Sequence, residues 1–72
     1  MPLSQHDLDL ADSHIAAAEK RVSRQRQVID RLRSEGHDVA AEDGERLLRA
    51  LLFSLAEFKE HRRMMGARET DT

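Results

Sequence analysis

An apolar residue recurs every seven positions through the first half of the chain, and this repeat limits what the chain can fold into. The residues of this repeat are Leu8, Ile15, Val22 and Ile29. A second series lies between them, at spacings of three and four, and consists of Ala11, Ala18, Gln25 and Leu32. Such spacings place side chains along one stripe of an α-helix, as in a coiled coil. The sequence therefore predicts a long amphipathic helix over residues 7–34.

A break at Gly36, His37 and Asp38 separates this helix from a second apolar stripe. Gly36 can adopt the left-handed conformation that ends a helix, and the Asp38 carboxylate can cap the free amides that begin the next one. Because so short a connection joins neighbouring helices, we expect the second helix to lie antiparallel beside the first. The predicted fold class is an all-α, antiparallel two-helix hairpin.

The expected organisation is a helical hairpin at residues 7–65 between a flexible N-terminus at 1–6 and a flexible tail at 66–72. The turn is expected at residues 35–38 and the second helix at 39–65. Folding about this turn opposes residues whose numbers sum to about 73. The expected opposed pairs are Ile29 with Gly44, Val22 with Leu51, Ala18 with Leu55, Ile15 with Phe58, and Leu8 with Met65.

Two residues in this register depart from the apolar pattern. Gly44 costs about 1 kcal/mol inside a helix, so we expect either a close approach of the two backbones or a kink at this position. Gln25 interrupts the apolar series of the first helix. It is either a buried polar residue that fixes the register, at some cost in stability, or an edge residue whose side chain reaches solvent.

The apolar stripe of the second helix spans an arc of about 140°, which is wider than one partner helix can cover. Short chains of this kind also draw little stability from a single core. We therefore expect a homodimer in which two hairpins form a four-helix bundle. The predicted interface residues are Leu47, Leu48, Leu51, Leu52, Leu55 and Phe58. Phe53, near Met64, is either a second contact surface or a lone exposed aromatic residue.

The second half of the first helix is basic, which raises the possibility of nucleic-acid binding. The residues concerned are Lys20, Arg21, Arg24, Arg26, Arg31 and Arg33. They are scattered around the helix, acidic residues of the second helix lie beside them, and no aromatic residue is interleaved for base stacking. Nucleic-acid binding is therefore the alternative function, and a solvated charged face is the preferred interpretation.

The predicted register brings His14 near His61 at the open end of the hairpin, with Asp12 and Glu57 close by and His6 beyond. Histidines with carboxylates suit a zinc or nickel site or a pH-sensitive contact. However, no dedicated ligand signature is present, so we interpret these as surface histidines and expect no metal.

No catalytic constellation or phosphate-binding loop is recognisable, and we expect neither enzymatic activity nor a cofactor. The chain has no cysteine, no leader-like segment and no apolar run long enough to span a membrane. We therefore expect a cytoplasmic, self-associating interaction or regulatory module. Its expected partners are a second copy and a protein of unknown identity.

The segment Ala18 to Leu32, followed by Gly36-His37-Asp38, resembles a segment found in small bacterial proteins. In that group an Arg-Gln pair, an Arg-Leu pair and a Gly-His-Asp turn recur in this order. The resemblance covers about a third of the chain and implies a helical hairpin of bacterial origin, without an assigned activity. It also draws attention to His37, whose ring we expect to bond a terminal carbonyl of the first helix, with a partner contact as the alternative.

Overall fold

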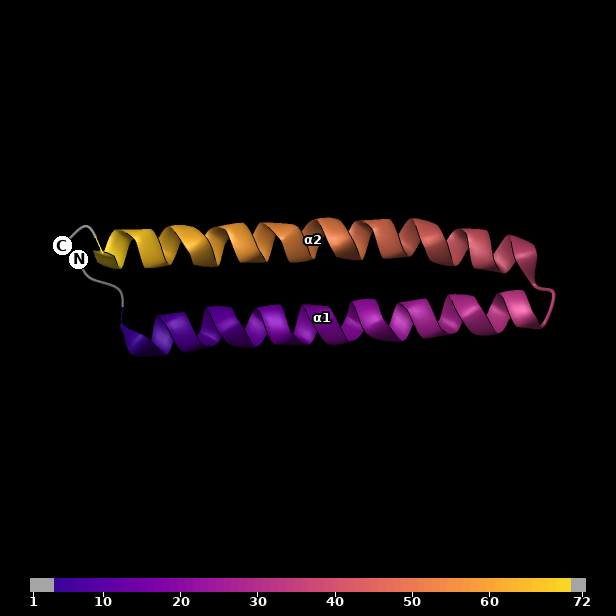
Figure 1. Ribbon diagram of the computed structural model, residues 1–72, viewed down its shortest axis with the longest axis horizontal. Coiled ribbons are helices and arrows are strands. Elements are labelled where there is room, and N and C mark those ends of the chain that lie inside the picture. The colour runs from indigo at the N-terminus through magenta and orange to yellow at the C-terminus, as the bar shows by residue number, and fades with distance from the viewer. Residues whose placement is uncertain (1–3, 71–72) are drawn as a thin grey trace.

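The computed structural model describes residues 4–70 and consists, over that range, of two helices and no strands. Helix α1 spans Gln5–Ser34 and helix α2 spans Asp38–Thr70. The helices run antiparallel side by side, so that the start of α1 and the end of α2 lie at the same end of the molecule (Figure 1). The prediction of an all-α two-helix hairpin is confirmed.

Helix α1 begins two residues before the predicted start because Ser4 caps it. The Ser4 hydroxyl accepts a hydrogen bond from the Asp7 amide at 3.1 Å, and the Asp7 carboxylate accepts one from the Ser4 amide at 3.3 Å. This reciprocal pair is a capping box, which satisfies two amide groups that would otherwise lack partners. Residues 4–6, which we expected to belong to a flexible N-terminus, are therefore the cap and first turn of α1.

The turn between the helices is a Schellman motif built on Gly36. Its φ angle of +79° lies in the left-handed region, as predicted from the sequence. The Gly36 amide donates to the Arg33 carbonyl at 3.1 Å, and the His37 amide donates to the Leu32 carbonyl at 2.8 Å. These two bonds satisfy carbonyls at the end of α1. The expected bond from the His37 ring is thus wrong, since the backbone amide of His37 makes the contact instead.

Helix α2 is longer than predicted at both ends. Asp38 is its first residue, so this carboxylate lies within the first turn and not before the helix as a cap. In that position it interacts favourably with the positive end of the helix dipole. At the other end the helix continues through Gly66 to Thr70, five residues beyond the expected end at Met65. One glycine costs a helix only about 1 kcal/mol, so Gly66 does not stop α2. Residues 1–3 and 71–72 of the two predicted flexible segments lie outside the described range.

The contact between the helices is a thin row of apolar side chains. The buried hydrophobic residues are Leu8, Ala18, Val22, Ile29, Ala41, Leu55 and Met65. At the middle of the hairpin, Ala18, Val22 and Leu55 form a buried cluster, against which half-buried Ile15, Leu48 and Leu51 pack. The predicted seam of α1 is therefore the face that contacts α2, with small residues of α1 set against leucines of α2.

Gly44 lies against Ile29, as the register predicted. A Cβ atom at residue 44 would lie 3.0 Å from Ile29 Cγ1 and 3.2 Å from Gln25 Nε2. The half-buried Gln25 side chain donates a hydrogen bond from Nε2 to the Gly44 carbonyl at 2.9 Å. Gln25 therefore links the two helices at one register position, and Gly44 permits their close approach there.

The hairpin is long and thin, with extents of 55 × 15 × 12 Å and a radius of gyration of 16.5 Å. A compact chain of this length would have a radius of gyration of about 11 Å. The accessible surface is 5599 Å², whereas a compact monomer of this mass exposes about 4,600 Å². The single hairpin therefore leaves about 1,000 Å² more surface in water than a compact fold would.

Candidate functional site

One side of the hairpin carries ion pairs that connect the two helices. Arg33 Nη2 lies 2.5 Å from Glu45 Oε1, and Arg62 Nε lies 2.8 Å from Asp12 Oδ1. Asp12 and Arg33 are three heptads apart on α1, which places them on the same side of the helix. We call this side of the hairpin the charged face.

The opposite side carries exposed apolar side chains from both helices. Leu10 and Val28 of α1 are 48% and 41% exposed, and Leu47 and Phe58 of α2 are 51% and 37% exposed. Leu10 and Val28 are 18 residues apart, and Leu47 and Phe58 are 11 residues apart. Both separations are close to a whole number of helical turns, so the two members of each pair lie on the same side of their helix. Leu10 and Asp12 are two residues apart, and so are Leu47 and Glu45, which turns each apolar side chain about 200° from the charged one. Leu10, Val28, Leu47 and Phe58 therefore define an apolar face.

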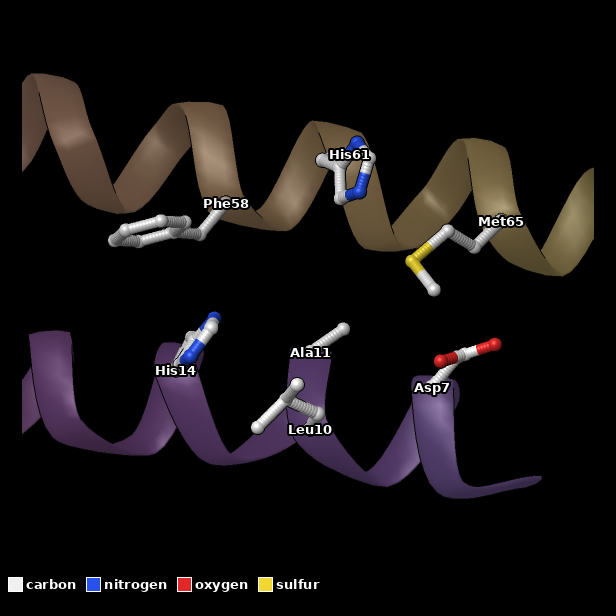
Figure 2. Close-up of a pocket in the computed structure, with 7 residues that line it drawn as sticks. All are labelled: Asp7, Leu10, Ala11, His14, Phe58, His61 and Met65. Atoms are coloured by element: carbon white, nitrogen blue, oxygen red, sulfur yellow. The ribbon is translucent and has the colours of Figure 1, made fainter. Parts of the chain in front are cut away.

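The apolar face is hollowed near the open end of the hairpin, where Leu10 and Phe58 lie (Figure 2). This cleft has a volume of about 370 Å³ and is lined by Asp7, Leu10, Ala11, His14, Phe58, His61 and Met65. The His14 and Phe58 rings lie with their centroids 5.9 Å apart and are tilted by 45°. The cleft thus combines an aromatic and aliphatic lining with two imidazoles and one carboxylate.

The structure brings together some of the residues expected around His14. His14 and His61 line the same cleft, as the register predicted. Asp12, however, pairs with Arg62 on the charged face, and Glu57 is not part of the cleft lining. Within residues 4–70, no group of three or more histidine, aspartate or glutamate side chains is placed to hold a metal ion.

A second cleft of about 260 Å³ lies on the apolar face toward the turn. Its lining consists of Arg21, Arg24, Gln25, Val28, Leu47 and Leu51. His14, Arg21 and Val28 succeed one another at seven-residue spacing along α1, and so do Leu51, Phe58 and Met65 along α2. Because the heptad spacing keeps residues on one side of a helix, the two clefts form one continuous surface along the hairpin.

The six predicted interface residues occupy three different places. Leu55 is buried, and Leu48 and Leu51 are half-buried, in the contact between the two helices. Leu47 and Phe58 are on the apolar face. Leu52, which is 37% exposed, is one heptad after Glu45 and so lies toward the charged face. Within one hairpin, the six predicted interface residues are thus divided between the contact of α1 with α2, the apolar face and the side toward the charged face, and their role in a dimer stays a prediction.

The sequence reasoning did not identify Leu10 and Val28, which contribute the α1 half of the apolar face. Both lie beside the main stripe, two residues after Leu8 and one residue before Ile29. Their 18-residue spacing equals five helical turns, so the sequence alone could have shown that they lie on the same side of the first helix. Phe53 and Met64 are 67% and 49% exposed and lie on neither cleft.

Several basic residues are held by carboxylates. A hydrogen bond from Arg33 to Glu45, reinforced by the charge of Glu45, raises the pKa of the Arg33 guanidinium. On α2, Arg63 donates two hydrogen bonds to Glu60, at 2.9 and 2.6 Å, which lower the pKa of the Glu60 carboxyl. Arg33 is thereby engaged within the hairpin, which reduces the positive charge that the basic half of α1 offers to a nucleic acid.

Comparisons with protein-family models, curated proteins and solved structures found no match to this chain. In the part of the chain that the structure describes, neither helix has a stretch long and apolar enough to cross a membrane.

Proposed function

We propose that this chain is a self-associating interaction or regulatory module, in which two hairpins pack through their apolar faces into a four-helix bundle. The observation that carries the proposal is that exposed apolar side chains from both helices share one side of the hairpin. Leu10 and Val28 of α1 lie on the same side of the hairpin as Leu47 and Phe58 of α2, opposite the ion pairs that connect the helices. Covering such a surface removes apolar area from water, which stabilises the assembly by about 25 cal/mol per Å² of apolar surface buried.

The dimensions of the apolar face suit a second copy of the same chain. Laid from end to end along the hairpin, which measures 55 by 15 Å, a second copy covers a projected area of about 800 Å², comparable with the accessible surface that each partner buries in a standard protein interface. It is also close to the surface that the hairpin exposes in excess of a compact monomer. A second hairpin has the same length and offers the same apolar stripe, so one copy covers the other from end to end.

Nucleic-acid binding through the basic half of α1 is less well supported than self-association. Arg33 is paired with Glu45, and Arg21 and Arg24 lie beside leucines in the cleft near the turn. Specific or non-specific binding to phosphates requires accessible basic side chains and weakens steeply with salt. If the chain does not bind duplex or single-stranded DNA or RNA even at low salt, where phosphate contacts are strongest, this alternative is removed.

The proposal is tested by placing a charge on each side of the hairpin in turn. Leu47→Glu and Phe58→Glu alter the apolar face, whereas Leu52→Glu alters a position toward the charged face that is as exposed as Phe58, at 37%. Size-exclusion chromatography with light scattering should give a dimer mass for the wild type and Leu52→Glu, and a monomer mass for the other two variants. Circular dichroism of each variant records whether the helices persist.

Two results would contradict the proposal. One is a wild-type chain that remains helical at a monomer mass of 8.3 kDa. The other is a Leu52→Glu variant that loses its dimer mass as readily as Leu47→Glu, because association would then not depend on the apolar face.

A further inference from the structure

We infer that the dimer binds a polyvalent phosphate at its centre, between Arg21 and Arg24 of one copy and the same two residues of the other. Such a site rests on the proposed self-association, because neither copy completes it alone. Its ligand is a small oxyanion that carries several negative charges, and pyrophosphate represents this class.

The positive charge of the hairpin is concentrated at its middle. Residues 20–29 and 46–56 carry six basic side chains and no acidic one. At the turn, residues 30–45 carry two basic residues against six acidic ones, and at the open end residues 4–19 and 57–70 carry four against seven. Both ends are therefore acidic, and a second copy laid along the hairpin sets one basic middle against the other.

Arg21 and Arg24 bring part of this charge onto the apolar face. Both side chains are exposed, and both line the cleft that also contains Val28 and Leu47. Arg21 is one heptad before Val28, and Arg24 is two heptads after Leu10. Because residues at heptad spacing share one side of a helix, both arginines lie among the exposed apolar side chains of α1.

These two arginines have no carboxylate partner. In the part of the chain that the structure describes, four other arginines pair with carboxylates, whereas neither Arg21 nor Arg24 forms an ion pair. The carboxylates closest to the middle of the hairpin belong to Glu19 and Glu57. Glu19 is one heptad after Asp12 and so lies on the charged face, and Glu57 lines neither cleft. The centre of the apolar face therefore presents positive charge alone.

An end-to-end dimer brings the arginines of both copies together. The midpoint of α1, which spans Gln5–Ser34, falls between residues 19 and 20. Arg21 and Arg24 lie about 2 and 7 Å from this midpoint along the helix axis. When two hairpins overlap over their whole length, middle meets middle whether like or unlike ends are joined. Four guanidinium groups therefore gather in one short stretch of the interface.

Four like charges weaken the dimer unless an anion accompanies them. A guanidinium group presents a planar fork of donors that binds phosphate oxygens through two parallel hydrogen bonds. One chloride ion neutralises one of the four charges, whereas pyrophosphate carries several charges on two adjoining phosphoryl groups. The exposed side chains of Ala17 and Ser54, one heptad after Leu10 and Leu47, are small and leave space beside the arginines.

The site is tested by sedimentation equilibrium of the full chain with and without pyrophosphate, at an ionic strength held constant with sodium chloride. A ligand that binds the dimer and not the monomer strengthens association, so about 1 mM pyrophosphate should lower the dimer dissociation constant about tenfold. Isothermal titration calorimetry should give one pyrophosphate for every two chains, because the site is shared.

A double variant, Arg21→Gln with Arg24→Gln, removes the four charges from the interface. At low salt without pyrophosphate it should dimerise more tightly than the wild type, and its dissociation constant should not respond to pyrophosphate. Arg26→Gln with Arg49→Gln is the matched control, since it removes two charges per chain from the same basic middle. Arg26 is one heptad before Arg33, toward the charged face, and Arg49 lines neither cleft, so this variant should keep the wild-type response.

The possible failures of the anion site and of self-association are distinguishable. A wild-type dimer whose dissociation constant is unchanged by pyrophosphate would overturn the anion site and leave self-association standing. One pyrophosphate per chain would also overturn it, because each hairpin would then bind the anion alone. Equal loss of the response in both double variants would overturn it as well, because the effect would then follow total charge. A wild type that stays monomeric in both solutions would instead contradict the proposed function.

Discussion

Gly44 shows how a single residue sets the distance between the two helices. A glycine inside a helix is unfavourable by itself, yet here the absence of a side chain lets Ile29 approach to 3.0 Å from where a Cβ would be. The Gln25 amide uses the same space to reach the Gly44 carbonyl. The cost of the glycine is thus offset by a contact and a hydrogen bond that link the helices.

We predict that Gly44→Ala destabilises the hairpin although alanine is the better helix former. The gain in helix propensity is about 1 kcal/mol, and overpacking against Ile29 and Gln25 costs about 1–3 kcal/mol. Urea denaturation should therefore show a net loss of about 1 kcal/mol. Gly66→Ala is the matched control, because its Cβ would meet the flexible Arg62 side chain at 3.4 Å, and it should stabilise α2. Equal stabilisation by both changes would show that residue 44 is not a point of close approach.

We predict that the Glu60 carboxyl titrates below the ordinary value of 4.5, because hydrogen bonds from Arg63 lower its pKa. A lowered pKa means that the pair stabilises the folded chain above pH 4.5, and that this contribution is lost as the pH falls through the lowered pKa. Carbon-13 NMR of the Glu60 side chain measures the midpoint. Arg63→Ala should raise that midpoint toward 4.5, and an unchanged midpoint would mean that the pair does not form in solution.

At the scale of elements, Gly36 is the residue on which the hairpin turn depends. The Schellman bonds from the Gly36 and His37 amides require a left-handed conformation at residue 36, where φ is +79°. A residue with a Cβ atom reaches that conformation at a cost of about 1–2 kcal/mol. The turn is therefore stable with glycine and strained with most other residues.

We predict that Gly36→Ala lowers the free energy of unfolding by about 1 kcal/mol per chain, because alanine disfavours positive φ. Gly36→Asn should lose less, since asparagine enters the left-handed region more readily. Nothing lies within 4 Å of a Cβ at residue 36, so a steric clash does not complicate the comparison. Chemical denaturation followed by circular dichroism gives the values, and equal losses for the two variants would argue against strain at this φ angle.

The elements themselves were largely predictable from the sequence, and their ends were less so. The seven-residue repeat of α1 and the glycine at residue 36 determine the hairpin and its register, since one apolar stripe and one left-handed residue permit few alternatives. Ser4 and Asp7 form a recognisable capping box, which the apolar repeat alone did not reveal. The continuation of α2 through Gly66 reflects a cost too small to end a helix already supported by packing.

At the scale of the whole molecule, the candidate site was predictable in part. The width of the α2 stripe indicated excess apolar surface, and Leu47 and Phe58 do lie exposed on one face. A helical wheel of one helix, however, does not reveal which leucines the other helix covers, and in the hairpin Leu48, Leu51 and Leu55 pack against α1. Leu10 and Val28 were missed because they complete the face only once α1 and α2 are placed side by side.

Sedimentation equilibrium of the unmodified chain tests the central claim most directly, namely that the apolar face is covered by a second copy. Between 1 and 100 µM, we predict that the weight-average mass rises from near 8.3 kDa toward twice that value, and that helicity and thermal stability rise with it. A mass that stays at 8.3 kDa across the whole range, with full and concentration-independent helicity, would contradict the account.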